Sequence, residues 1–319
     1  MQLDRRSFLK WSATATVLTV TGAKQHGPES RNGMPYRALG KTGEKVSLLC
    51  LGGAHIGLPQ VSEEDGIRII RTAIDEGVNF LDNAWEYNGG LSEERMGRAL
   101  KDGYRDKVFL MTKHKGRDKA SAQRQLEESL RRLDVDVIDL WQFHEIVQPD
   151  LPGRIYSEGA LDVALEAKAQ GKIRYIGFTG HHFPAYLVEM IGRGFEWDTI
   201  QMPLNVFDHH FRSFEHEVLP HALDKGIGVI AMKALGGSPG EIPNRSKAAS
   251  VEECLRYTMS LPVATVCSGI DSIDVLRQNL AIVKSFQPIT AQERAALLAR
   301  TRADAAEGAY EPYKTRWHA

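Results

Sequence analysis

Short continuous runs of apolar residues alternate with longer amphipathic stretches over most of the chain. Apolar runs bounded by polar residues are typical of strands buried on both faces, and apolar residues three or four positions apart are typical of helices with one buried side. The pattern predicts strands at residues 48–51, 79–81, 108–112, 137–143, 174–178, 199–202, 228–232 and 263–267. It predicts helices at residues 63–76, 92–100, 120–133, 161–169, 186–191, 215–225, 251–260 and 274–286.

This alternation has the sequence form of a (β/α)8 TIM barrel, an α/β fold in which a helix follows each strand. A doubly wound parallel sheet is the competing fold, and it would carry G-x-G-x-x-G after its first strand. Residues 51–57 give only a loose approximation of that pattern. We therefore predict the barrel.

The barrel prediction extends to the segments before and after the alternation. Residues 36–47 contain two short extended pieces around a glycine-bearing turn, which predict a β-hairpin that closes the bottom of the barrel. Residues 290–306 predict a further helix, and residues 310–319 an irregular tail. Together these segments predict one domain over residues 36–319, with an N-terminal β-hairpin and a C-terminal helical extension.

The first residues have a different character. Arg5 and Arg6 precede Phe8-Leu9-Lys10 and then a short, weakly apolar tract that ends in small residues near Ala23. This segment, residues 1–23, resembles a twin-arginine export signal, and residues 24–35 resemble a polar linker. The resemblance predicts an exported, periplasmic protein that engages the export machinery. The alternative is a disordered or amphipathic N-terminus on a cytoplasmic protein.

Composition excludes several partners. Lysine plus arginine and aspartate plus glutamate nearly balance, for a net charge of −1, so no basic excess indicates nucleic acid. The apolar run near the N-terminus is too short to span a bilayer, and we expect no stable membrane span elsewhere. The three cysteines, Cys50, Cys254 and Cys267, lack metal or disulfide spacing. We predict buried, inert thiols.

Four chemically active side chains follow three consecutive predicted strands. Asp82 and Tyr87 follow the second strand, Lys113 the third and His144 the fourth. Residues at the carboxyl ends of barrel strands converge on one face. A free phenol has a pKa of about 10, and a neighbouring ammonium lowers it by favouring phenolate. The set could protonate an oxygen while a cofactor delivers hydride to the adjacent carbon, because no side chain supplies hydride.

These residues carry a family resemblance. Residues 82–87, followed by Ser92-Glu93, resemble the aldo-keto reductase pattern D-x-A-x-x-Y…S-E, and later blocks follow in the family's order. The resemblance implies an NAD(P)-dependent oxidoreductase acting on a small aldehyde or ketone, or on the corresponding alcohol. It implies that Tyr87 is the general acid, that Lys113 and Asp82 tune it, and that His144 orients the substrate.

The same resemblance implies a set of cofactor contacts. Gln201 would meet the nicotinamide carboxamide and Asn279 the adenine. Thr179, with Gly180, stands where the family usually has Ser-Asn, and Met232 stands where a tyrosine commonly stacks on the nicotinamide. Asp271 lies near positions where NADPH-preferring members carry basic residues. A carboxylate would repel a 2′-phosphate, so we expect NAD(P)H as cofactor, with NAD favoured over NADP.

Two rival functions come from other classes. Histidines follow many predicted strands, so the rim of the barrel could hold a metal ion together with Glu145 and Asp208, as in a metal-dependent hydrolase or isomerase. The histidines concerned are His55, His114, His144, His181, His182, His209 and His210. The other rival is a non-catalytic, nucleotide-binding redox sensor. Such a binder would not need Lys113 beside the Tyr87 phenol.

Overall fold

The computed structural model describes residues 30–237 and 240–315. The signal segment predicted over residues 1–23 lies outside these ranges. The predicted linker, residues 24–35, is too long at its C-terminal end, because Ser30–Arg31 form strand β1 and pair with the start of β2 (Met34–Ala38). The hairpin is confirmed: β2 pairs antiparallel with β3 (Lys45–Ser47).

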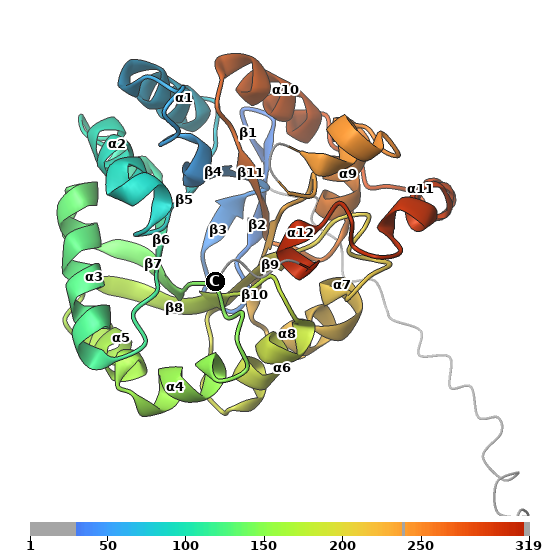
Figure 1. Cartoon of the computed structure of the whole chain (residues 1–319). Helices are drawn as coiled ribbons and strands as arrows, with labels where there is room; N and C mark the ends of the chain where they lie inside the picture. Colours follow the sequence, from blue (N-terminus) through green and yellow to red (C-terminus); the bar gives the residue numbers. More distant parts are fainter. Residues whose placement is uncertain (1–29, 238–239, 316–319) are drawn as a thin grey trace, which may run out of the picture.

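Eight parallel strands close into the predicted barrel (Figure 1). The circle is completed by pairing of the last strand with the first, where Cys267 stands opposite Cys50. In chain order the strands are β4 (Leu49–Gly52), β5 (Phe80–Asp82), β6 (Phe109–His114), β7 (Ile138–Phe143), β8 (Ile173–Thr179), β9 (Thr199–Pro203), β10 (Gly228–Met232) and β11 (Thr265–Gly269).

Helices surround the barrel, as the periodicity predicts (Figure 1). Serine caps begin several of them: Ser62 accepts from the backbone of Asp65 at the start of α1, and Ser250 forms a capping box with Glu253. The outer helices are α1 (Glu63–Asp75), α2 (Leu91–Ala99), α3 (Lys119–Leu133), α4 (Leu151–Ser157), α5 (Ala160–Ala169), α6 (Pro184–Gly192), α7 (Phe214–Glu217), α8 (Leu219–Asp224), α9 (Val251–Ser260) and α10 (Ile273–Lys284).

The helix predicted over residues 215–225 is two short helices, α7 and α8. The break lies at Val218, whose φ of −112° departs from helical values, and Pro220 follows in the first turn of α8. Proline removes a backbone donor and favours the start of a helix over its interior. The single-helix prediction was therefore wrong at this point.

The hairpin closes one end of the barrel through apolar contacts. Leu39 and Val46 are fully buried and belong to the same cluster as the barrel residues Phe80, Phe109 and Ile230. The hairpin turn approaches the barrel closely, because a side chain at Gly40 would lie 2.3 Å from the backbone nitrogen of Gly228. Only glycine fits there, since Gly40 also has a φ of 55°.

The C-terminal residues lie over the opposite end of the barrel. Helix α11 (Ala291–Ala305) confirms the predicted extension. The predicted irregular tail contains a short helix, α12 (Pro312–Thr315; Figure 1), whose residues bond to Asn205 and Asp208 in the loop after β9. The Lys314 ammonium is fully buried and lies 2.6 Å from Asp208 and 3.1 Å from Glu311. These buried charges order the tail. Within the described residues, no helix has the length and apolar character needed to cross a bilayer.

Candidate active site

The carboxyl ends of β5, β6 and β7 bring the predicted catalytic residues together. Asp82 is the last residue of β5, Lys113 lies one residue before the end of β6, and His144 follows β7 directly. Tyr87 lies in the turn after β5. Parallel strands end on the same face, so local strand positions explain why these four side chains meet.

The Lys113 ammonium is the centre of this group. It lies 3.2 Å from the Tyr87 hydroxyl, forms an ion pair with Asp82 and donates to the carbonyl of Asn83 at 2.7 Å. The rings of Tyr87 and His144 stand nearly perpendicular, at 80°, with their centroids 5.7 Å apart. Lys113 is 1% exposed, so solvent screens its charge little.

The charges in this group act on the phenol in opposing directions. Burial raises the pKa of Tyr87 above its ordinary value, and the Lys113 ammonium lowers it by a smaller amount. Burial alone would lower the pKa of Lys113, but attraction to Asp82 and Tyr87 raises it. The sequence-based expectation of a net lowering for Tyr87 was therefore wrong. Tyr87 keeps its proton beside a permanent cation, which is the form that a proton donor needs.

Asp82 also binds groups from two other strands of the barrel. The side-chain amide of Gln201, in β9, donates to Asp82 at 3.1 Å, and the thiol of Cys267, in β11, lies 2.9 Å from the same carboxylate oxygen. Cys50 and Cys254 are buried as predicted, whereas Cys267 is partly exposed. The prediction of an inert Cys267 thiol overlooked its contact with Asp82.

His144 has a carboxylate neighbour that sequence reasoning missed. Its Nδ1 atom is fully buried and lies 3.2 Å from Oε1 of Glu86, although the N–H direction is not aligned for a full hydrogen bond. Lys115 bridges Glu86 and Glu145 at 2.5 and 2.6 Å, and Glu145 lies 3.4 Å from His181. Burial lowers the pKa of His144, and Glu86 acts in the opposite direction. Glu86 directly precedes Tyr87 in the sequence, and this position could have identified Glu86 as a candidate site residue.

Three of the predicted cofactor contacts lie on neighbouring strands: Thr179 and Met232 end β8 and β10, and Gln201 lies in the middle of β9. Thr179 stands opposite Gln201 in the strand register, and Met232 ends β10 partly exposed. The Oε1 atom of Gln201 is buried and has no hydrogen-bond partner among the residues that the structure describes. An unsatisfied buried acceptor indicates a missing donor, and the amide of a nicotinamide carboxamide is such a donor. This end of the barrel therefore fits a nicotinamide dinucleotide.

The two remaining predicted contacts lie at β11 and α10, on a different part of the rim. Asp271 is exposed in the turn between them. Asn279 is 2% exposed and donates to the hydroxyl of Ser268 at 2.8 Å. The described residues show no contact between this pair and the catalytic group.

The histidines do not form one rim cluster. His114 is 1% exposed, stacks on Trp141 with ring centroids 3.7 Å apart, and points into the layer between strands and helices. Asp208, a suggested metal ligand, is instead paired with Lys314. These two residues are therefore structural.

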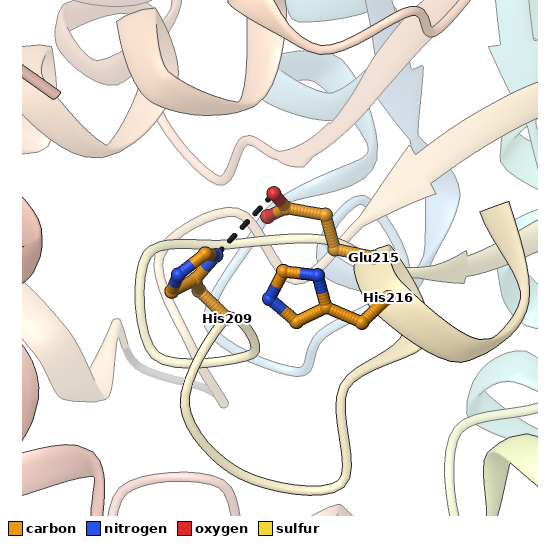
Figure 2. A group of neighbouring side chains, drawn as sticks. All are labelled: His209, Glu215 and His216. Atoms are coloured by element: carbon orange, nitrogen blue, oxygen red, sulfur yellow. Dashed lines mark hydrogen bonds and ion pairs between the residues drawn. The ribbon is translucent and has the colours of Figure 1, made fainter. Parts of the chain in front are cut away.

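One group outside the barrel has the residue types of a metal site. His209, Glu215 and His216 have ligand atoms within 4.8 Å of one another (Figure 2). However, the Arg294 guanidinium lies 2.5 Å from Glu215 and 3.4 Å from Nδ1 of His209. Tyr257 donates to the other oxygen of Glu215 at 2.6 Å. An arginine already neutralises the carboxylate, which disfavours a divalent cation there.

A second such group, Glu86, His144 and Glu145, contains part of the catalytic set. Lys115 lies within 2.6 Å of both carboxylates. In each metal-like group within the described residues, a basic side chain of the protein already occupies the carboxylates. The geometry therefore favours proton transfer at Tyr87 over metal-assisted hydrolysis.

Comparison with known proteins agrees with this geometry. The sequence profile of the Aldo/keto reductase family matches residues 48–247. L-galactose dehydrogenase of Arabidopsis thaliana is 30% identical over 292 residues, which are 79% of this chain and 89% of that protein. The holo form of aldo-keto reductase AKR11C1 from Bacillus halodurans superposes with a TM-score of 0.70 at 27% identity, covering 84% of this chain and 96% of that one.

A more distant structure shows the fold alone. An aldo-keto reductase from Klebsiella pneumoniae, solved in complex with NADPH, has a TM-score of 0.67 at 23% identity, over 82% of this chain and 94% of that one. The barrel, the convergent catalytic group and the family match agree with one another. The chain belongs to the aldo/keto reductase family and is an NAD(P)-dependent oxidoreductase that acts on carbonyl compounds.

Proposed function

We propose that Tyr87 is the proton donor in the reversible reduction of an aldehyde or ketone to an alcohol. The observation that carries this assignment is the Lys113 ammonium, 3.2 Å from the Tyr87 hydroxyl and paired with Asp82 on its other side. A phenol so placed can release a proton because the phenolate left behind faces a fixed cation.

Each side chain has a distinct role in this mechanism. A bound reduced nicotinamide ring supplies the hydride that the carbonyl carbon receives. Tyr87 gives its proton to the carbonyl oxygen, and Lys113 stabilises the resulting phenolate. Asp82 holds the lysine charged and in place, and the His144 ring, perpendicular to that of Tyr87, orients the oxygen. In alcohol oxidation the same residues accept the proton.

The test is turnover of an aldehyde and ketone panel with both reduced cofactors. It compares the native enzyme with Tyr87→Phe, which removes only the hydroxyl. The matched control is Tyr104→Phe, because Tyr104 bonds to Asp75 on the outside of the barrel at 3.0 Å. We expect a loss of about 100- to 10,000-fold in kcat for Tyr87→Phe and none for the control. Equal activity of both variants would reject the assignment.

We propose that Gln201, Thr179 and Met232 hold the nicotinamide end of the cofactor and that Asn279 and Asp271 hold the other end. The buried, unpaired Oε1 of Gln201 supports the first group. The exposed carboxylate of Asp271 supports use of NADH at least as well as NADPH, because it would repel a 2′-phosphate. The NADPH complex of the Klebsiella protein supports the opposite preference. Steady-state kcat/KM values measured with NADH and with NADPH test this cofactor preference. A large preference for NADPH would reject the proposed use of NADH.

We propose that residues 1–23 direct export by the twin-arginine route and that the barrel domain follows after a linker. The order of Arg5-Arg6, Phe8-Leu9-Lys10 and a small-residue tract supports this. Because that route carries folded proteins, the enzyme could leave with its cofactor tightly held. Cell fractionation of the native chain and of Arg5→Lys/Arg6→Lys tests the route. Equal distribution of the two forms between the cell fractions would reject export by this route. Purification of the protein free of nucleotide would reject cofactor retention.

The substrate panel includes sugars because the Arabidopsis relative is named for L-galactose. We propose a small carbonyl compound or the corresponding alcohol, with L-galactose as one member of the oxidation panel. Activity on L-galactose above that on simple alcohols would support a sugar substrate for this chain, and preference for simple alcohols would exclude it.

A further inference from the structure

Lys233 has an unusual backbone conformation at the end of β10. It follows Met232 directly and has a φ of 58°, in the left-handed region that side chains other than glycine rarely adopt. Its carbonyl is held there by the backbone of Gly236 at 2.8 Å and by the side-chain amide of Asn205 at 3.1 Å. Strained residues that their surroundings hold firmly in place gather at functional sites.

The ammonium of Lys233 has no carboxylate within ion-pair distance among the described residues. Its side chain contacts the ring of Tyr313, whose centroid lies 4.8 Å from Nζ. Tyr313 is itself fixed, because its hydroxyl bonds to Glu311 at 2.6 Å and to Asn205 at 3.0 Å. An aromatic face attracts a cation but does not neutralise it. The charge of Lys233 is therefore left for another partner.

The carboxylates nearby are already occupied by other cations. Asp82 pairs with Lys113, and Glu145 pairs with Lys115 at 2.6 Å. The side chain of Lys233 remains partly exposed, yet the surrounding protein lowers its pKa, with Lys113 adding repulsion. A partly buried, unpaired ammonium is costly unless a ligand pairs with it.

Lys233 follows β10 directly, so it lies at the barrel face where the strands that carry Lys113 and His144 also end. Burial lowers the pKa of Lys233, Glu145 raises it and Lys113 lowers it, and the latter two come from the segments of β7 and β6 at the same face. Its own charge acts on His181, which lies between Glu145 and the Tyr313 carbonyl, at 3.4 Å from each. Contacts through Tyr313, His181 and Glu145 thus connect Lys233 to the Lys115 ammonium beside Glu86 and His144.

We propose that Lys233 binds a carboxylate or phosphate group on the carbonyl substrate and so makes the enzyme prefer anionic substrates. This inference rests on the proposed carbonyl reduction at Tyr87. The diphosphate of the dinucleotide is the other possible anion. Nζ of Lys233 lies 4.8 Å from the ring centroid of Tyr313 in the C-terminal segment, and the dinucleotide affinity of the variants distinguishes the two anions.

The experiment compares two aldehydes that differ in charge and little in shape: 4-carboxybenzaldehyde and 4-carbamoylbenzaldehyde. Their kcat/KM ratio is measured for the native enzyme, Lys233→Met and Lys233→Arg. The matched control is Lys225→Met, because Lys225 is exposed just before the other end of β10 and its loss changes the net charge equally. Calorimetric binding of benzoate and benzamide, with oxidised cofactor present, gives a readout that needs no turnover.

We expect the native enzyme and Lys225→Met to favour the carboxylate aldehyde by about ten- to hundred-fold, the range for a hydrogen bond to a charged group. Lys233→Met should abolish that preference and the preference for benzoate over benzamide, and Lys233→Arg should keep part of both. Dinucleotide dissociation constants should change by less than about twofold. Lys233→Arg keeps the positive charge, so its comparison with Lys233→Met separates loss of charge from misfolding.

Three results would overturn the inference. An unchanged aldehyde ratio in Lys233→Met excludes a substrate anion at this residue. Loss of dinucleotide affinity with an unchanged ratio assigns Lys233 to the cofactor's diphosphate. Failure of every protein to reduce either aldehyde counts against the proposed carbonyl reduction. The benzoate measurement then still tests the anion site. Equal benzoate binding by the native enzyme and Lys233→Met rejects anion binding at Lys233.

Discussion

Oε1 of Glu86 lies 3.2 Å from Nδ1 of His144, a ring nitrogen that is otherwise fully buried. Because the carboxylate faces Nδ1, it favours a proton on that nitrogen and stabilises the imidazolium when the ring is doubly protonated. We therefore expect Glu86 to act on the reaction through His144, as a positioning residue. The same carboxylate is held by Lys115 at 2.5 Å, which restricts its movement.

Glu86→Gln should lower kcat/KM by about ten- to hundred-fold, the value of one charge-assisted contact. Burial lowers the pKa of His144 and Glu86 opposes that effect, so the variant should lower this pKa further. The limb of the kcat/KM–pH profile that reports His144 should move to lower pH. A purely structural role would reduce the rate without moving the limb. Glu63→Gln, at an exposed ion pair with Arg98, is the control.

Removing one partner of the Asp82–Lys113 pair should destabilise the fold strongly. Asp82→Asn and Lys113→Met should each lower the free energy of unfolding by about 3–5 kcal/mol, because each leaves an uncompensated buried charge. The double variant should be more stable than the sum of the two losses implies. Urea unfolding of the four proteins measures this coupling, and additive losses would show that the two charges do not interact. All three variants should lack carbonyl reduction at native rates.

His114 should make stability fall in mild acid. Burial holds its pKa well below 6.5, and within the described part of the chain neither ring nitrogen has a hydrogen-bond partner. Between the two pKa values the unfolded chain binds a proton that the folded chain does not, so stability rises with pH in that window. Each unit of pH below about 6.5 should cost up to about 1.4 kcal/mol from this residue. His114→Phe should keep the stack on Trp141 and flatten the slope, as urea unfolding between pH 5 and 7 would show.

The C-terminal segment should depend on the buried pair of Lys314 and Asp208. Lys314→Met leaves the Asp208 and Glu311 carboxylates buried without their cation, so we expect a loss of about 3–5 kcal/mol in the stability of that segment. Asp208→Asn/Lys314→Met should recover part of the loss. Hydrogen exchange at α12 and at the loop after β9 measures the effect locally. If exchange there stayed as slow as in the native protein, the pair would not hold the segment.

The strands and the convergence of the four candidate catalytic residues could be predicted from the sequence because each depends on local order along the chain. Apolar runs mark buried strands, and the carboxyl ends of parallel strands share one face, so Asp82, Lys113 and His144 had to converge once the barrel was assigned. The split between α7 and α8 was also readable in principle from Pro220. No long-range information was needed for these features.

Side chains alternate between the two faces of a strand, and this alternation decides which of two adjacent polar residues points into the barrel. Lys113 points into the barrel toward Asp82, and the next residue, His114, points outward to Trp141. Successive side chains of a strand face opposite sides, so two adjacent polar residues have opposite roles. Without an assigned register, His114 resembled the other rim histidines.

The remaining features came only from the tertiary structure. Cys267 meets Asp82 across 185 positions of sequence, and Lys314 meets Asp208 across 106. The free charge of Lys233 depends on which distant carboxylates already have partners. The sequence by itself determined the barrel and the residues at its strand ends, because these follow from local periodicity. Only the closed fold decided burial, pairing and pKa, because these depend on neighbours that no local pattern encodes.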